Sequence, residues 1–482
     1  MNERDVRLQR LAELRARGRD PFVATRYDRT HLAADLKARF EELEGCRVRV
    51  CGRVMARRGH GRAAFMDVCD ESGPIQVFAA QDVLGEEAYD ALRLLDVGDF
   101  IAVEGEVFRT RAGEISVRAH RGDIIAKAIR PLPDKWHGLS DVEVRFRRRY
   151  LDLIMSPEVR GLFRKRSRMI AAIREMLTGR GFLEVETPMM QPIPGGAAAR
   201  PFMTHHRALD IDLYLRVAPE LYLKRLIVGG FERVFEINRN FRNEGMDRSH
   251  NPEFTMLELY WAYADFRDIM TITEDITVAA AQAACGGLKT TFAGHEVDLT
   301  PPWRRLAIDE ALREHAGCSM SDLADDESAA RLATDRGLRI DGPRNVGSVL
   351  KKLVDEFVEP RLIQPTHLME HPVSISPLAK RKADQPELTQ RFESIVCGQE
   401  LANAFSELND PIDQRGRLEA QAAARAAGDE EAHPMDEDFL EALEYGMPPT
   451  GGLGIGVDRL LMLLADKQSI REVILFPLMR PE

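Results

Sequence analysis

The chain has 482 residues and a formal net charge of −11, with 44% hydrophobic and 30% charged residues. This length allows two or three domains with substantial buried cores, and the composition is ordinary for a globular protein. The acidic balance argues against a general nucleic-acid binder. No run of about 18 apolar residues suggests a membrane span, and the charged start MNERDVRLQR lacks the apolar core of a signal peptide.

The cysteines form no CxxC pair, so neither a zinc site nor a disulfide framework is indicated. Free thiols in a reducing cytosol are the simpler interpretation, and we therefore expect a cytoplasmic location. The six cysteines are Cys46, Cys51, Cys69, Cys285, Cys318 and Cys397.

Positive charge gathers in two places on this acidic chain. Residues 1–62 hold 16 Lys and Arg against 9 Asp and Glu, and the run RFRRR occupies residues 145–149. Locally basic regions suit a protein that contacts RNA over part of its surface. Solvated helix faces explain the same charges equally well.

The first 128 residues predict a small helical start followed by a β domain. Residues 8–18 and 31–45 have helical patterns, and from residue 47 the pattern changes to alternation. Five short β segments, separated by Gly-containing turns and one helical stretch at 86–95, fit a small barrel of the OB type. The five segments cover residues 48–58, 63–70, 73–80, 99–110 and 114–128.

A Pro-rich joint at residues 130–135 predicts a domain boundary, which we place between residues 137 and 138. Beyond it, helices alternate with short strands, so an α+β domain is expected over residues 138–482. Residues 262–355 are rich in Ala and Asp, and we expect a helical insertion there. The chain has no GxxxxGK[ST] loop and no Rossmann GxGxxG, so any ATP must be held in another way.

Three separated segments carry candidate chemistry. Taken alone, GFLEVETP at 181–188 is explained as a helix end that runs into a strand ending at a proline. The second segment, residues 235–260, predicts a strand, a polar loop and a strand that place Arg242, Glu244, His250 and Phe254 around one pocket. Arg242 offers a planar fork for phosphate or carboxylate, and Phe254 offers a face on which a base can stack. The third segment, Gly-rich residues 451–456, enters an apolar helix that carries Arg459 near its start.

The order GFLEVETP, FRNE and GLGIGVDR resembles the three signature motifs of class II aminoacyl-tRNA synthetases. Further blocks resemble the bacterial lysyl-tRNA synthetases in particular. These blocks are residues 52–65, 131–139, 194–202, 218–245, 400–410 and 474–482. The resemblance covers about residues 10–482. It implies an N-terminal OB-fold barrel that binds an anticodon, and a catalytic domain built on an antiparallel β-sheet flanked by helices.

The resemblance also implies an activity: activation of L-lysine with ATP, then transfer of lysine to the 3′ end of tRNA(Lys). Mg²⁺ is the expected cofactor, and a homodimer is expected because the first motif resembles a dimer-forming element. Arg242 and Arg459 match the catalytic arginines that clamp the ATP phosphates. The other positions that match ATP-binding residues are Glu244, His250, Asn251 and Phe254, of which Phe254 stacks on adenine.

Glu393 and Glu400 match the acidic pair that holds magnesium, a hard cation that selects carboxylate and phosphate oxygens. Glu258 and Glu407 match the acids that receive the lysine ε-ammonium, a group too costly to bury without a paired carboxylate. The remaining matches for lysine binding are Tyr260, Asn403 and Phe405 along the side chain, and Gly196 and Glu220 at the α-amino end.

In the barrel, Arg53, Phe65, Gln76 and Glu114 match positions that read anticodon bases. Phe65 is expected to stack on a splayed base, although barrel core is the competing interpretation of this phenylalanine. One departure from the family lies in the loop of the second motif. Many bacterial members place Arg directly before the histidine of HNPEF, where this chain has Ser249, with Arg248 one position earlier.

Three alternatives remain open at this stage. An aspartyl- or asparaginyl-tRNA synthetase shares the barrel and the motifs, but its pocket should offer cations rather than Glu258 and Glu407. A relative that attaches lysine to a protein typically lacks the N-terminal barrel. A catalytically inactive RNA-binding paralogue would have lost a motif arginine or a magnesium acid, and this chain retains them.

Overall fold

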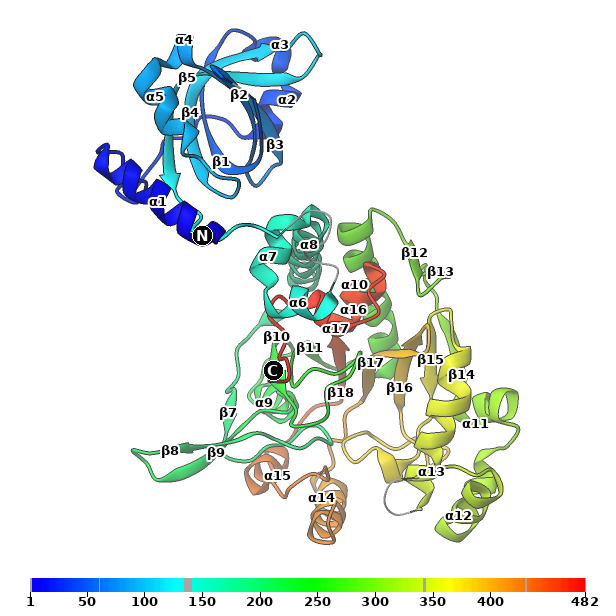
Figure 1. Ribbon diagram of the computed structural model, residues 1–482. Helices are drawn as coiled ribbons and strands as arrows, with labels where there is room; N and C mark the ends of the chain where they lie inside the picture. The colour runs from blue at the N-terminus through cyan, green and yellow to red at the C-terminus, as the bar shows by residue number, and fades with distance from the viewer. Residues whose placement is uncertain (1, 60, 134–140, 341–343, 430, 482) are drawn as a thin grey trace. The chain divides into compact units, whose positions relative to one another are not determined.

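The computed structural model describes residues 2–59, 61–133, 141–340, 344–429 and 431–481 (Figure 1). The chain divides into two compact units, Met1–Ser140 and Asp141–Glu482. The boundary expected at residues 137–138, and most of the block at 131–139, lie outside the described residues. Within the described residues, no helix is both long enough and apolar enough to cross a membrane.

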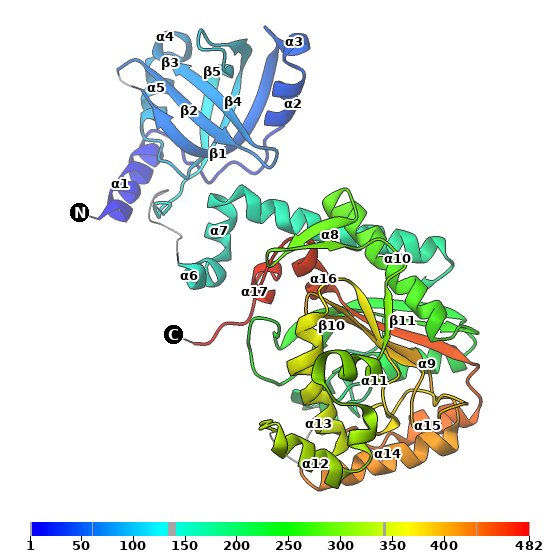
Figure 2. The same cartoon turned by 90° about the vertical axis from the view of Figure 1, so that its right-hand side faces the viewer.

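Unit 1 contains a closed five-stranded barrel with strand order β1-β2-β3-β5-β4, which confirms the five β segments expected from the sequence (Figure 2). Its strands are β1 (Arg47–Arg58), β2 (Ala63–Cys69), β3 (Pro74–Ala80), β4 (Phe100–Arg109) and β5 (Ile115–Ala126). Its helices are α1 (Glu3–Ala16), α2 (Ala33–Ala38), α3 (Phe40–Leu43), α4 (Gln81–Leu84) and α5 (Glu86–Arg93). Side chains alternate along each strand, so Met66 and Val68 fill the barrel while Phe65 faces outward.

Unit 2 is built on an eight-stranded sheet with order β14-β15-β16-β17-β18-β11-β10-β6. Neighbouring strands are antiparallel except for the parallel pairs β6–β10 and β14–β15, so the expected antiparallel catalytic sheet is confirmed. The strands are β6 (Leu183–Glu184), β10 (Arg233–Phe241), β11 (Glu253–Ala262), β14 (Arg304–Ala307), β15 (Thr366–Met369), β16 (Arg391–Val396), β17 (Gln399–Ser406) and β18 (Thr450–Gly456).

Helices α8, α10 and α16 cover one face of this sheet (Figures 1 and 2). On β11 the fully buried Leu257 and Leu259 pack into that core, so the alternate residues Glu258 and Tyr260 face the opposite side. Helices α9 and α15 pack around Tyr260 on that opposite side.

The helices of unit 2 other than those of residues 289–362 are α6 (Val142–Arg147), α7 (Arg149–Met155), α8 (Pro157–Gly179), α9 (Glu220–Val228), α10 (Phe266–Cys285), η5 (Val373–Ile375), α14 (Pro411–Ala426), α15 (Glu437–Glu444), α16 (Val457–Leu464) and α17 (Ile470–Val473).

Residues 262–355, where a helical insertion was expected, contain strands as well as helices. They include the hairpin of β12 (Lys289–Phe292) and β13 (His295–Asp298), and also β14, an edge strand of the main sheet. Gly294 follows the left-handed Ala293 in the hairpin turn, a local signal stronger than overall composition. The helices that follow are α11 (Ile308–Ala311), η1 (Leu312–Ala316), η2 (Met320–Leu323), α12 (Asp326–Asp335), α13 (Val346–Leu353), η3 (Val354–Val358) and η4 (Glu359–Arg361).

A small separate sheet in unit 2 has the order β7-β9-β8. Its strands are β7 (Met190–Gln191), β8 (Met203–His206) and β9 (Ile211–Leu215). Several of its apolar side chains are exposed, with Met203 at 66% and Met190 at 56%.

Candidate active site

Two rows of side chains cross the sheet on the face opposite α10. The strand registers align one row through Glu393, Asn403, Gly454, Glu258 and Glu236. They align the second row, two residues along each strand, through Arg391, Phe405, Gly452, Tyr260 and Val234. The sheet therefore brings together residues from three distant parts of the sequence.

The glycines of β18 form a floor in the middle of these rows. A Cβ atom at Gly452 would collide with Oε1 of Glu407 and with the Tyr260 ring. On the other face of the strand, a Cβ at Gly451 would lie 2.5 Å from Cγ1 of Ile269 on α10. Glycine is required on this strand because a side chain on one face would displace the helix, and on the other would fill the site.

Buried carboxylates lie above this floor. Glu258 is 5% exposed, and burial together with the nearby Glu220 carboxylate raises its pKa to about 8. Tyr260 donates a long hydrogen bond of 3.4 Å from its hydroxyl to Glu258 Oε2. Glu407 is 1% exposed, and among the described residues no donor is hydrogen-bonded to its Oε1 atom, which lies over Gly452. Burial raises the pKa of Glu407 well above its usual range.

A buried lysine, which the sequence analysis did not single out, lies among these acids. The Lys224 ammonium is 2.6 Å from Oε1 of Glu220, four residues earlier on α9, and forms an ion pair with Oε2 of Glu407. Burial lowers the pKa of Lys224, but the two carboxylates outweigh that effect and raise it above its usual value. Gly196, with φ of +92°, lies against Glu220, since a Cβ at Gly196 would be 2.9 Å from Cβ of Glu220.

The loop after β10 brings the predicted arginines close to aromatic and imidazole rings. The Arg242 guanidinium carbon is 5.2 Å from the centroid of the Phe254 ring. From the start of α16, Arg459 reaches Nε2 of His250 at 3.4 Å and Glu400 Oε2 at 3.3 Å. Asp247 holds the His250 ring, with Oδ2 at 2.9 Å from Nδ1. These contacts place Arg242 beside the Phe254 ring and Arg459 beside the His250 imidazole.

Other predicted residues of this loop have fewer contacts with other site residues. Within the described residues, the exposed Glu244 carboxylate has no hydrogen bond or ion pair. Asn251 is buried and donates to the Glu253 carbonyl oxygen at 2.6 Å. Ser249 donates its backbone N–H to Asp247 at 2.7 Å, while Arg248 is exposed and its carbonyl accepts from the Ile470 N–H.

The two expected magnesium acids lie on adjacent strands. Glu393 on β16 accepts from Arg391 at 2.6 Å, and Glu400 on β17 is the partner of Arg459. Burial, and then the Asp355 and Glu393 carboxylates, raise the pKa of Glu359 to about 8, which marks this corner as rich in acid. Among the described residues, no group of three or more His, Cys, Asp or Glu side chains is arranged to hold a metal ion.

An aromatic cluster lies on the outer surface of the barrel. Phe65 is half-buried, and its ring centroid is 4.8 Å from that of Phe78, which lies 6.3 Å from that of Phe108. Phe65 is therefore a surface residue of β2 and not barrel core. Gln76 accepts from the Ser116 hydroxyl at 2.9 Å, and Glu114 is exposed. Arg53 stacks on Phe100 with its guanidinium carbon 4.3 Å from the ring centroid.

Comparisons with known proteins match both units. The family of tRNA synthetases class II (D, K and N) matches residues 141–480, and an OB-fold nucleic acid binding domain matches residues 48–125. Similar curated proteins, all named lysine–tRNA ligase, come from Pelotomaculum thermopropionicum (57% identity, 99% of this chain and 94% of the relative), Carboxydothermus hydrogenoformans (55%, 99% and 97%) and Syntrophomonas wolfei (54%, 99% and 96%). The chain belongs to the class II lysyl-tRNA synthetases.

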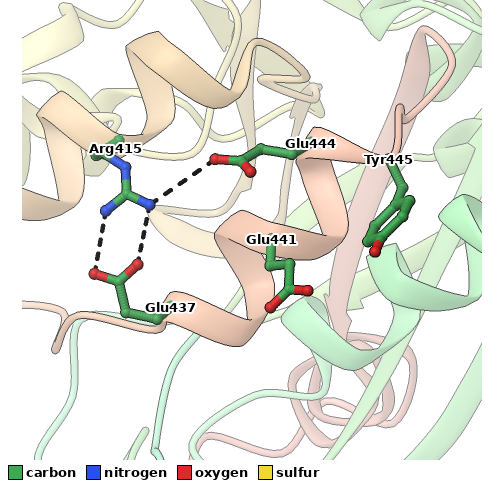
Figure 3. A pocket seen from close by; sticks show the side chains of 5 residues that line it. All are labelled: Arg415, Glu437, Glu441, Glu444 and Tyr445. Atoms are coloured by element: carbon green, nitrogen blue, oxygen red, sulfur yellow. Dashed lines mark hydrogen bonds and ion pairs between the residues drawn. The ribbon is translucent and has the colours of Figure 1, made fainter.

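This synthetase also has a charged surface pocket between α14 and α15 (Figure 3). Arg415 forms a two-pronged ion pair with Glu437, at 3.1 and 3.0 Å, and Glu444 lies 4.0 Å away. Glu441 and Tyr445 complete the lining. None of the predicted site residues of the synthetase lines this pocket, and its arginine is already paired, so we assign it no part in the reaction.

Proposed function

We propose that this chain activates L-lysine with ATP and then transfers the lysyl group to the 3′ end of tRNA(Lys). In the first step, a carboxylate oxygen of lysine attacks the α-phosphorus of ATP, giving lysyl-adenylate and releasing pyrophosphate. In the second, a terminal ribose hydroxyl of the tRNA attacks the lysyl carbonyl and releases AMP. The relatives' names and the family match support both steps.

The observation that carries lysine as the substrate is the unpaired oxygen of Glu407. A buried carboxylate oxygen without a donor is costly, and a ligand ammonium would supply the missing hydrogen bonds. We assign the lysine ε-ammonium to Glu407 and Glu258, above the Gly452 floor. An aspartate or asparagine side chain brings no cation to these acids, which disfavours the alternative of a synthetase for either amino acid.

We assign the rest of the lysine pocket from its position along the two rows. The aliphatic part of the substrate packs against Tyr260 and Phe405, beside the Asn403 amide. Glu220 and Gly196, which lie against each other, receive the α-amino end. This orientation points the substrate carboxylate toward the loop that carries Arg242.

For ATP, we propose that Arg242 and Arg459 neutralise the phosphates and that adenine stacks on Phe254. Glu244, His250 and Asn251 complete the nucleotide site. Since no protein nucleophile is needed, catalysis rests on holding the carboxylate near the α-phosphorus and on neutralising the charge that develops there.

The acid-rich corner at Glu393 and Glu400 fits Mg²⁺, which commonly binds one or two protein carboxylates together with substrate phosphates. Each carboxylate pairs with an arginine, and a cation bound at this corner would lower the raised pKa of nearby Glu359. Bound Mg²⁺ would supply further neutralisation of the phosphate charge.

On the barrel, we propose that Phe65 stacks on an anticodon base while Arg53, Gln76 and Glu114 contact the neighbouring nucleotides. An exposed aromatic face is suited to splayed bases, because stacking on it requires only a π surface. Phe78 and Phe108 extend this face, and their alternation with buried residues in β3 and β4 is the sequence signal for them.

We further propose a homodimer in the cytoplasm. Exposed apolar side chains in the first motif and in the small sheet that follows it are suited to a partner surface; they include Leu183 in the motif, and Met190 and Met203 in the sheet. The lack of a CxxC pair among the six cysteines is compatible with a reducing compartment. Sedimentation of the purified chain should give twice the monomer mass, and a monomer at micromolar concentration would contradict the dimer.

ATP–pyrophosphate exchange, measured with each amino acid in turn, tests the proposed reaction. Exchange should depend on lysine, and charging of tRNA(Lys) should follow. Exchange that depends on aspartate or asparagine, or no exchange with any amino acid, would overturn the assignment.

A further inference from the structure

The Lys224 side chain is fully buried in the proposed lysine pocket, yet it belongs to the protein. Glu220 and Lys224 are four residues apart on α9 and therefore share one helix face. The Lys224 ammonium lies near two aromatic rings, with its nitrogen 5.5 Å from the Phe405 centroid and 5.9 Å from that of Phe439. Its charged end enters the same group of acids that we assign to the substrate.

Three buried carboxylates converge here, from Glu220, Glu258 and Glu407. One ammonium cannot neutralise all three, and burial favours the protonated form of any carboxyl without a cation. Lys224 contacts two of them, Glu220 at Oε1 and Glu407 at Oε2. The third, Glu258, is outside its ion pairs, and its pKa of about 8 is consistent with the missing cation.

The ion pair also fixes the orientation of Glu407. Because Oε2 faces the Lys224 ammonium, only Oε1 is turned toward the floor at Gly452, where it is unpaired. This inference rests on the proposed lysine site and concerns how Glu407 is oriented in that site before the substrate binds. We propose that Lys224 is a positioning residue for lysine recognition, whose buried ammonium pairs with one oxygen of Glu407, favours its ionised form and leaves the other oxygen turned toward the substrate.

Other charged groups around Lys224 do not replace it. His433, in the segment before α15, is buried, and burial together with the Lys224 charge lowers its pKa to about 4, so it is neutral at pH 7. Arg391 on β16 acts on Glu220, but its own hydrogen bonds go to Asn403 and Glu393. Tyr260 on β11 is uncharged because burial raises its pKa well above 10.

The test is pyrophosphate exchange by wild type and K224M between pH 6.5 and 9. At pH 7 we expect K224M to raise the KM for lysine by about tenfold or more, since each unit of pKa above the assay pH weakens cation binding about tenfold. The KM for ATP should change less than about twofold, because the ion pairs of Lys224 go to Glu220 and Glu407 and not to the residues assigned to ATP. The lysine defect should shrink as the pH rises, because a higher pH favours the ionised form of Glu407 in the variant.

Two outcomes would overturn the proposal. One is a folded K224M with the lysine KM of wild type. The other is a defect of the same size at every pH, which indicates a purely structural role. A wild-type enzyme without lysine-dependent exchange would instead refute the proposed function itself. K127M, which removes a buried barrel lysine also placed between two carboxylates, is the matched control and should retain the lysine KM.

If K224M does not fold, E407Q and K224M/E407Q carry the test. The double variant removes both charges of the Lys224–Glu407 pair, so that only Glu220 loses its partner, whereas K224M leaves both Glu220 and Glu407 without one. Lys224 acts through Glu407 in this proposal, so both variants should show the same KM for lysine. A further rise in the double variant would mean that Lys224 acts independently and would overturn the proposal.

Discussion

Lys127 in the barrel and Lys224 in the catalytic unit are both buried ammonium groups between two carboxylates, but their surroundings differ. In the barrel, Lys127 and Arg10 pair with Asp96, while Asp99 accepts from Lys127 and from the backbone N–H groups of Asp96 and Ala128. Every carboxylate oxygen of that cluster has a donor. In the catalytic unit, Glu407 keeps an oxygen without one.

This difference separates a structural ion network from a binding site. A buried polar atom without a partner costs about 1–3 kcal/mol, so folding alone gives no reason to leave one open. The barrel cluster is complete within the protein and fixes the end of β5. The catalytic cluster is completed only when a cationic ligand binds. The free-energy cost of the unpaired oxygen in the empty site is then removed, and this contributes to the affinity for the ligand.

The largest effect is expected for E407Q, which removes the open carboxylate. Removing the carboxylate that pairs with a bound ammonium costs about 2–5 kcal/mol in binding, so kcat/KM for lysine should fall on the order of 100-fold or more. The KM for ATP should stay within a few-fold of wild type. Pyrophosphate exchange at varied lysine and ATP measures both, and a lysine KM like that of wild type would remove Glu407 from the pocket.

K127M should show the opposite pattern. Asp96 and Asp99 would lose their shared cation, so the barrel should lose about 3–5 kcal/mol of unfolding free energy. Exchange with lysine should be unaffected, while charging of tRNA should weaken as the barrel unfolds. Denaturant melts and the two assays distinguish these effects. A change in the lysine KM would break the comparison between the two clusters.

A smaller, pH-dependent effect is expected from Glu258. Its pKa is raised to about 8 in the free pocket, so below that pH a proton must leave before the carboxylate pairs with the lysine ammonium. The KM for lysine should therefore fall by up to about tenfold per pH unit from pH 6.5 to 8 and then level off. E258Q should have a raised KM for lysine without this slope, and a slope retained in E258Q would assign it to another group.

The smallest effect is expected at the exposed ion pairs between α14 and α15. R415A removes contacts to Glu437 and Glu444 that lie in solvent, where ion pairs contribute little. The melting temperature and the exchange kinetics should match wild type within error. A clear loss of activity would show that the pocket in Figure 3 has a function not assigned above.

Much of this architecture could be predicted from sequence because the signals are local. Alternation identified the barrel strands, and it also places Glu258 opposite Leu257 and Leu259 on β11. Overall composition was a poorer guide over residues 262–355, where the hairpin turn at Ala293 and Gly294 outweighs the Ala- and Asp-rich helices around it.

Lys224 could not be assigned in the same way. Its four-residue spacing from Glu220 is visible in the sequence, but that spacing is common on helices and usually marks a solvated pair. Only the fold shows that the helix face is buried and that Glu407, far along the chain, lies against it. The loop at Arg248 and Ser249 remains a prediction, because its ligand contacts depend on phosphates.

Strand β18 has a consequence for how this protein can change by mutation. Because Gly451 and Gly452 face opposite sides of one strand, alanine at either position is damaging, but for unrelated reasons. At Gly451 the added methyl group meets Ile269 and should reduce the yield of folded enzyme. At Gly452 it meets Glu407 and should leave a folded enzyme that discriminates poorly among amino acids. Substitutions at two adjacent glycines are therefore expected to affect two different properties: the amount of folded enzyme at Gly451 and the accuracy of amino-acid selection at Gly452.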